Sequence, residues 1–168
     1  MITIQNGSAT TTYDDVIKAM LALLDLIIDS RYVTHRNERG EFVIDRFDRP
    51  APRRVYEPAR VRSGPSIRVR SNNDAHVGPF RRAIGSFFNG TSGSAMPMLR
   101  EYKLFNWGVM KKRAVLHAFQ VELVALDTLA DDLLDTCDEQ SFVDAVRVYL
   151  EGGHSMPFEF MLATIKAA

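Results

Sequence analysis

The chain has 168 residues and a mass of 19.0 kDa, with 46% hydrophobic and 25% charged residues. These values are typical of one folded globular domain and exclude an intrinsically disordered chain. The 21 basic and 21 acidic residues cancel, but residues 31–100 hold 14 arginines against 6 acids, a local charge of +8 (14 − 6). The single cysteine, Cys137, excludes an intrachain disulfide, and the longest apolar run, residues 16–28, is too short and too charged to cross a bilayer.

The N-terminal half is predicted to begin with a helix over residues 12–29. Its apolar positions recur every three to four residues on more than one side, which is typical of a helix buried on several faces. Residues 31–47 fit either a second helix or a hairpin, because Gly40 interrupts the helical pattern. Prolines exclude a long helix over residues 48–76, and the alternation of apolar and basic residues in 66–70 indicates a short strand with one basic face.

The C-terminal half is predicted to be helical. A third helix begins at Pro79 and ends at Asn89-Gly90. A fourth helix, over residues 107–134, carries apolar residues at alternating spacings of three and four, the pattern of a helix that packs along a core seam. A short helix is expected over residues 141–150.

The predicted fold class is therefore mainly α: a four-helix bundle with a small β element and a connecting segment rich in proline and arginine. We expect one helical domain over residues 1–153, followed by the tail 154–168. This apolar tail is expected to pack onto the bundle or to swap onto a neighbouring copy.

Enzymatic functions find no positive support in the sequence. The histidines lie at no spacing typical of a metal site, and there is no phosphate-binding loop or dinucleotide fingerprint. Cys137 and His117 lack the local signature of a nucleophile and its base, and a buried thiol is the simpler interpretation. We therefore expect no enzyme, no metal and no cofactor.

The arginine-rich middle third indicates contact with phosphate groups. Arginine presents a planar pair of donors that matches phosphate oxygens, and a basic segment of this density is typical of nucleic-acid-binding proteins. A solvated basic face that balances acids elsewhere in the monomer is the alternative. The candidates for phosphate contact are Arg36, Arg39, Arg46, Arg81, Arg82, Lys111, Lys112 and Arg113, and the candidates for base contact are Val115 and Phe119.

Acidic residues recur along the predicted fourth helix. Asp127, Asp131 and Asp135 are four residues apart, and like charges at this spacing destabilise a helix slightly. One interpretation is a soluble face. The other is that this stripe meets the basic segment of a neighbouring copy, which is a head-to-tail contact that builds rings or open helices.

Three stretches in this order resemble the coat proteins of rigid rod-shaped plant RNA viruses of the tobacco mosaic virus type. They are the basic-apolar strand 67–70 leading to the helix at Pro79, the cluster 111–113 that opens the long helix, and Ser141-Phe142 after a short loop. The positions where that family has phosphate-binding arginines hold residues 89–92 (Asn-Gly-Thr-Ser) here, so other arginines have to serve.

The resemblance implies a capsid protein that self-assembles into a helical rod and packages single-stranded RNA through arginine and lysine contacts with phosphate. Its partners would be copies of itself and RNA, without a membrane, and it would be found in the virion and in the host cytoplasm during assembly. Carboxylates between subunits would repel at neutral pH. The alternative, from the basic segment alone, is a small helical nucleic-acid-binding regulator that works as a dimer; a helical adaptor that binds protein is a third possibility.

Overall fold

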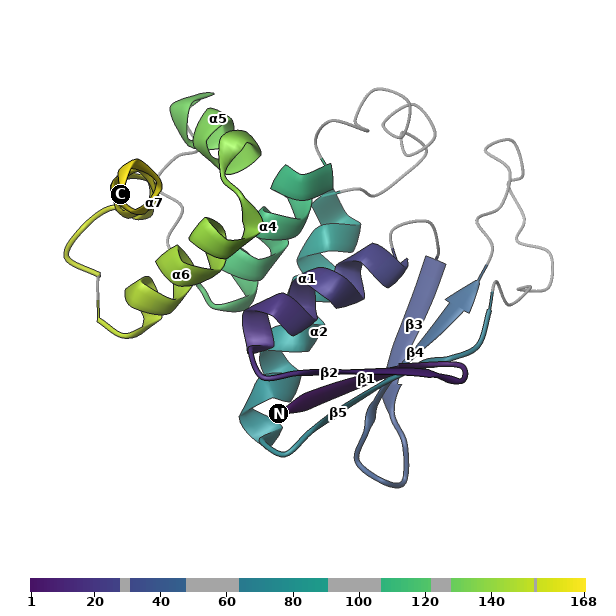
Figure 1. Ribbon diagram of the computed structural model, residues 1–168. Coiled ribbons are helices and arrows are strands. Elements are labelled where there is room, and N and C mark those ends of the chain that lie inside the picture. Colours follow the sequence, from purple (N-terminus) through teal and green to yellow (C-terminus); the bar gives the residue numbers. More distant parts are fainter. Residues whose placement is uncertain (28–30, 48–63, 91–106, 122–127, 153) are drawn as a thin grey trace, which may run out of the picture. The chain divides into compact units, whose positions relative to one another are not determined.

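The computed structural model describes residues 1–27, 31–47, 64–90, 107–121, 128–152 and 154–168. The chain forms two compact units, Met1–Arg81 and Arg82–Ala168. The first unit contains a β-sheet with a helix, and the second contains helices (Figure 1).

The sheet of the first unit has five antiparallel strands in the order β2-β1-β5-β4-β3. The pairs β1–β2 and β3–β4 are hairpins, and β5 joins the two hairpins by pairing with both β1 and β4. The strands are β1 (Ile2–Asn6), β2 (Ala9–Tyr13), β3 (Arg31–Arg36), β4 (Phe42–Phe47) and β5 (Ile67–Ser71).

The strands form because their side chains alternate between two faces. In β1, Ile2 and Ile4 are buried while the residue between them is only half-buried, and β5 repeats this pattern with Ile67 and Val69. The first hairpin reverses over Gly7-Ser8, where Gly7 has φ of 63°. That left-handed conformation suits glycine in the two-residue turn of a hairpin.

Helix α1 (Val16–Ile27) packs against β1 and β2. Asp15 caps it, because its Oδ1 accepts hydrogen bonds from the backbone nitrogens of Ile17 at 2.8 Å and Lys18 at 3.2 Å. Most of its apolar residues are buried, as the repeat of apolar positions predicted. The expected start at residue 12 was early by one turn, because residues 9–13 belong to β2.

The second unit is built from helices that pack in pairs. Helix α2 (Val77–Gly90) crosses the boundary between the units. Contacts join α4 to α5, α5 to α7 and α6 to α7, and the ring of Phe158 packs edge-on against Phe142 and Tyr149 at centroid distances of 6.4 and 5.9 Å. The other helices of this unit are α4 (Trp107–Ala118), α5 (Thr128–Thr136), α6 (Glu139–Leu150) and α7 (Phe158–Ala167).

The prediction of a mainly α four-helix bundle is wrong. The described residues form six α-helices and a five-stranded antiparallel sheet, which is a mixed architecture. The error began at the N-terminus: residues 2–7 read I-T-I-Q-N-G, the alternation and turn of a hairpin, but the prediction placed no strand there. Residues 31–47 form the hairpin and not the helix.

The prediction of one continuous helix over residues 107–134 is also wrong. Helix α4 ends at Ala118, and Gln120 takes a left-handed φ of 55°, which a helix cannot contain. A second helix, α5, begins at Thr128. The tail predicted to pack forms α7 against α6, and no helix in the described part of the chain is long and apolar enough to span a bilayer.

Candidate nucleic-acid interface

The outer face of the sheet, opposite the face that carries the buried isoleucines, is polar and basic. The strand register places five side chains in one row across it, one from each strand. Arg68 lies between Gln5 and Val43, and all of these except Val43 are exposed or half-buried. From one edge of the sheet to the other, the row is Thr10, Gln5, Arg68, Val43 and His35.

A second row lies beside the first, toward the start of β1. Arg70 faces Thr3, which in turn faces Thr12 on the edge strand. Arg68 and Arg70 are both exposed, whereas Ile67 and Val69, which alternate with them along β5, are buried. The strand predicted to have one basic face is therefore confirmed.

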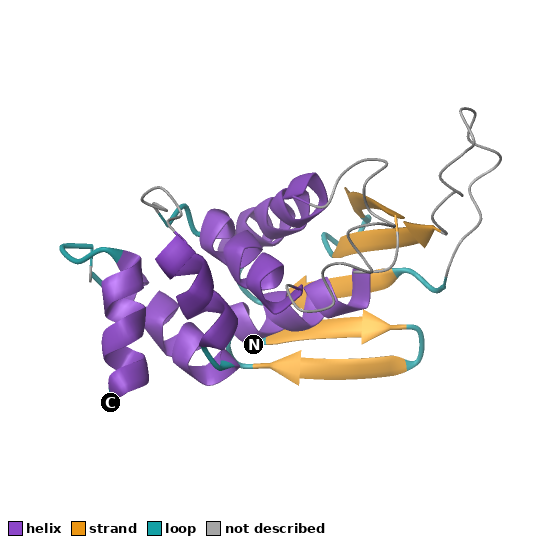
Figure 2. Ribbon diagram, turned by 90° about the horizontal axis from the view of Figure 1, so that it is seen from above, coloured by secondary structure: helices purple, strands orange, loops and turns teal. Residues whose placement is uncertain are grey.

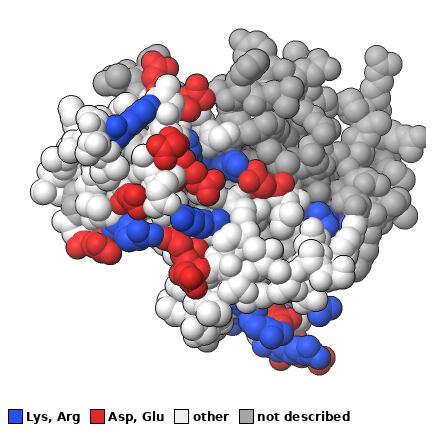
Figure 3. Space-filling view, in the orientation of Figure 1, with Lys and Arg blue, Asp and Glu red and all other residues white. Residues whose placement is uncertain are grey.

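The β3–β4 turn brings further basic side chains to this part of the sheet. Arg39 and Arg68 line a hollow of about 290 Å³ together with Asn37 and Glu38. Basic side chains gather at this hairpin with a few acids among them (Figure 3). Two guanidinium groups around one hollow provide the paired donors that a phosphate group requires.

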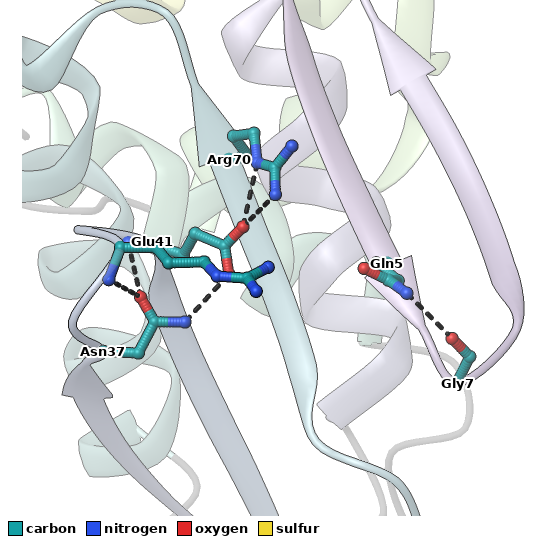
Figure 4. A network of polar contacts seen from close by, with 6 residues as sticks. Gln5, Gly7, Asn37, Glu41 and Arg70 are labelled. Carbon is teal, nitrogen blue, oxygen red and sulfur yellow. Dashed lines mark hydrogen bonds and ion pairs between the residues drawn. The ribbon is translucent and has the colours of Figure 1, made fainter.

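A buried carboxylate fixes the geometry of this region (Figure 4). Glu41 is 5% exposed, and its Oε1 accepts hydrogen bonds from Nε of Arg70 at 2.9 Å and from Nη2 of the same guanidinium. Its Oε2 accepts from Nδ2 of Asn37 at 2.8 Å. Asn37 Oδ1 in turn accepts from the backbone nitrogens of Arg39 and Glu41, both at 3.0 Å, and so closes the turn that presents Arg39.

The hydrogen bond from Arg70, and then that from Asn37, hold the pKa of Glu41 below its usual range, although burial opposes them. The ionised carboxylate is thus favoured in the folded state. Its contribution to stability is present at neutral pH and is lost as the pH falls through the lowered pKa.

We expect Glu41→Gln to lower the free energy of unfolding by about 1–2 kcal/mol at neutral pH, since Arg70 is largely exposed and solvent can replace the lost carboxylate. The deficit relative to wild type should shrink as the pH falls below the ordinary glutamate pKa of about 4.3, where the unfolded chain takes up a proton, and should vanish below the lowered pKa of the folded state. Urea denaturation followed by circular dichroism at several pH values measures this. A deficit that is the same at every pH would contradict the assignment.

The structure divides the predicted phosphate ligands of the first unit. Arg39 belongs to the outer face of the sheet, beside Arg68. Arg36 is exposed but pairs in register with Phe42, so it lies on the opposite face. Arg81 is exposed on α2.

Arg46 serves the fold. Its Nη1 donates to the carbonyl of Leu26 at 3.3 Å, at the end of α1, and its Nη2 donates to Asn6 Oδ1 at 2.9 Å and to the carbonyl of Pro65 at 3.2 Å. It therefore ties three chain segments together at one corner of the first unit.

The predicted ligands of the second unit include residues that are inside it. Lys112 is 9% exposed, and its Nζ donates to the backbone carbonyls of Leu134, at 2.8 Å, and Cys137. Burial lowers the pKa of this lysine. Val115 is fully buried, and Arg82 donates from Nε to the carbonyl of Ala118 at 2.9 Å while remaining exposed.

The remaining predicted residues of the second unit are half-buried or exposed where their side chains are described. Lys111, Arg113 and Phe119 are half-buried. Among the aspartates, Asp135 is exposed on α5, Asp131 belongs to the same helix, and Asp127 lies outside the described residues. Each of these predictions stays a prediction.

Glu41 and Asn37 were not predicted from the sequence, and Arg68 and Arg70 were not among the predicted phosphate ligands. The alternation in 66–70 was the signal for the two arginines. The Glu41 network depends on the pairing of β4 with β5, which no local pattern reveals.

Two observations concern other chemistry. Burial raises the pKa of the Cys137 thiol, so the group is protonated at neutral pH and is a poor nucleophile. Within the described residues, no three His, Cys, Asp or Glu side chains are grouped so that they could hold a metal ion. Comparison of the chain with protein-family models, with curated proteins and with solved structures finds no match.

Proposed function

We propose that this protein is a non-enzymatic, structural RNA-binding protein whose first unit contacts the phosphate backbone with the outer face of its sheet. The observation that carries the proposal is that exposed Arg68 on β5 and Arg39 of the β3–β4 turn line one hollow together with Asn37 and Glu38. Phosphate contacts of this kind supply sequence-independent affinity.

Single-stranded RNA suits this surface better than a duplex. The arginines stand beside hydroxyl and amide side chains of β1 and β2, namely Thr3, Gln5, Thr10 and Thr12, on a continuous sheet face. Such groups can bond to phosphate oxygens and to ribose 2′-hydroxyls. A duplex reader instead places a helix in the major groove, whereas this face of the first unit is built from strands.

Packaging of RNA as a coat protein is the biological role that we propose for this binding. The order of the sequence motifs supports this role. The mixed fold does not support it, because the resemblance implied a four-helix bundle. Electron microscopy of the purified protein with RNA at mildly acidic and at neutral pH tests this role. Rods or discs are the expected result, and dispersed particles under all conditions would leave RNA binding without packaging.

We expect Arg68→Gln to weaken binding of single-stranded RNA about 5- to 10-fold near physiological salt, because one charge-assisted phosphate contact is lost. The slope of log affinity against log salt should fall by about 0.7. Fluorescence anisotropy with a labelled RNA measures both quantities.

Arg147→Gln is the matched control, because Arg147 is exposed on α6 and pairs with Asp144 at 3.3 Å. It should leave the affinity and the slope unchanged. Equal slopes for Arg68→Gln and wild type would contradict the proposal. Preferential, saturating binding of duplex DNA would favour the dimeric regulator instead.

A further inference from the structure

One edge of the sheet is formed by β2, and its residues 9–12 are exposed (Figure 2). The strand reads Ala-Thr-Thr-Thr-Tyr, without charge and without proline, and its register with β1 runs through all its residues without a bulge. Proteins usually protect an edge strand with one of these devices, because the free backbone groups otherwise recruit another strand. We propose that β2 pairs with β2 of a second copy of this chain, and that the two sheets become one.

Within the described part of the chain, the outward backbone groups of β2 are free for this pairing. In an antiparallel pair, alternate residues bond across the ladder and the others turn their N–H and C=O away. The two-residue turn Gly7-Ser8 closes on the pair Asn6–Ala9, so the alternation assigns the outward groups to Thr10 and Thr12. When a second β2 approaches antiparallel with Thr11 opposite Thr11, Thr10 of each copy forms backbone hydrogen bonds with Thr12 of the other copy.

The side chains also fit a two-fold arrangement. With Thr11 on the axis, Thr10 faces Thr12 of the second copy and Ala9 faces its Tyr13. Threonine pairs directly across strands are favourable. The acidic Asp14 that follows β2 meets Ser8 of the other copy, and the two Asp14 residues lie at opposite ends of the interface, so no like charges oppose each other.

The other edge of the sheet does not fit its own copy in this way. Strand β3 has an arginine at each end, Arg31 and Arg36. Antiparallel pairing of β3 with β3 of a second copy in full register would place Arg31 opposite Arg36 of the other copy. Like charges directly opposite each other destabilise a strand pair. The difference between the two edges selects β2, and the identical partner follows from its neutral, self-complementary sequence.

The pairing has a geometric consequence for the outer face. A two-fold axis between antiparallel strands of one sheet is perpendicular to that sheet, so both outer faces point the same way. Arg68 and Arg70 of the two copies then lie on one continuous surface. The inference does not depend on RNA binding, because it rests on the edge and not on the face.

Thr10→Pro tests the pairing in the full chain. Proline removes a backbone donor that points to the free edge and leaves the bonds to β1 in place. Sedimentation equilibrium should give twice 19.0 kDa for wild type at high protein concentration and 19.0 kDa for Thr10→Pro. Thr10→Val keeps the donor and should remain dimeric. A wild-type monomer at all concentrations, or a dimer of Thr10→Pro as strong as that of wild type, would overturn the proposal.

A cysteine at the axis gives a second measurement that does not depend on the folding of the proline variant. In Thr11→Cys, the two thiols lie directly opposite in a pair without ladder bonds, a separation that a disulfide spans. Mild oxidation should link most of the protein into dimers on a non-reducing gel. Wild type carries only the buried Cys137 and is the control. Failure of Thr11→Cys to cross-link above the wild-type level would overturn the β2–β2 register.

Discussion

Truncation of Ile4 to alanine is expected to lower the free energy of unfolding of the first unit by about 3 kcal/mol. Ile4 is 3% exposed on β1, where it faces Val69 of β5 in register and shares the inner face with the buried residues of that strand. The loss combines the transfer of the removed methyl and methylene groups with the cavity that they leave. Urea denaturation followed by circular dichroism measures it.

Thr3→Ala is the matched control, since Thr3 is the neighbouring residue on the outer face and is only half-buried. It should cost less than about 1 kcal/mol. A negligible effect of Ile4→Ala would mean that the N-terminal residues do not belong to the core, and would contradict the position of β1 between β2 and β5.

Replacement of Lys112 by methionine is expected to destabilise the second unit by about 2 kcal/mol. Methionine fills a similar volume but cannot donate, so the carbonyls of Leu134 and Cys137 lose a buried charged partner. The substitution also removes the free-energy cost of burying the ammonium group, which offsets part of this loss of stability. The only tryptophan, Trp107, belongs to α4, so its fluorescence during urea denaturation reports on this unit.

The pH dependence of the same comparison has a definite sign. Burial lowers the pKa of Lys112, so in the alkaline range the unfolded chain binds more protons at this position than the folded chain. Stability from this group therefore rises as the pH approaches the ordinary lysine pKa of about 10.4. Lys111→Met is the control, because Lys111 is half-buried beside it. Equal destabilisation by the two substitutions would contradict a special role for Lys112.

Local patterns predicted several elements correctly. The apolar repeat of α1, the proline near the start of α2, the Asn-Gly at its end and the alternation of β5 all act through neighbours in sequence. The helix over 141–150 was likewise found, and α6 begins two residues earlier because Asp138 caps it by accepting from the backbone nitrogen of Ser141 at 2.9 Å.

The errors arose where distant segments decide the outcome. The threonines of β2 gave no apolar alternation, because an exposed edge strand needs none, so its pairing with β1 went unnoticed. The heptad spacing over 107–134 continued through a break that only the backbone of Gln120 reveals. The basic cluster 111–113 seemed to be a polar surface, but Lys112 faces inward, because the end of α5 supplies carbonyls that a sequence of α4 alone does not show.

Arg46 and Arg68 have different roles, although both belong to the arginine-rich segment. The guanidinium joins the end of α1 to Asn6 and to the chain before β5, so its loss would loosen one corner of the first unit. Arg68, a few residues away in sequence from one of these contacts, projects from the same unit into solvent. A mutational screen that recorded only the disappearance of a bound polyanion would score both positions alike. A parallel measurement of folding stability is needed to distinguish an arginine that stabilises the fold from an exposed arginine that binds a ligand.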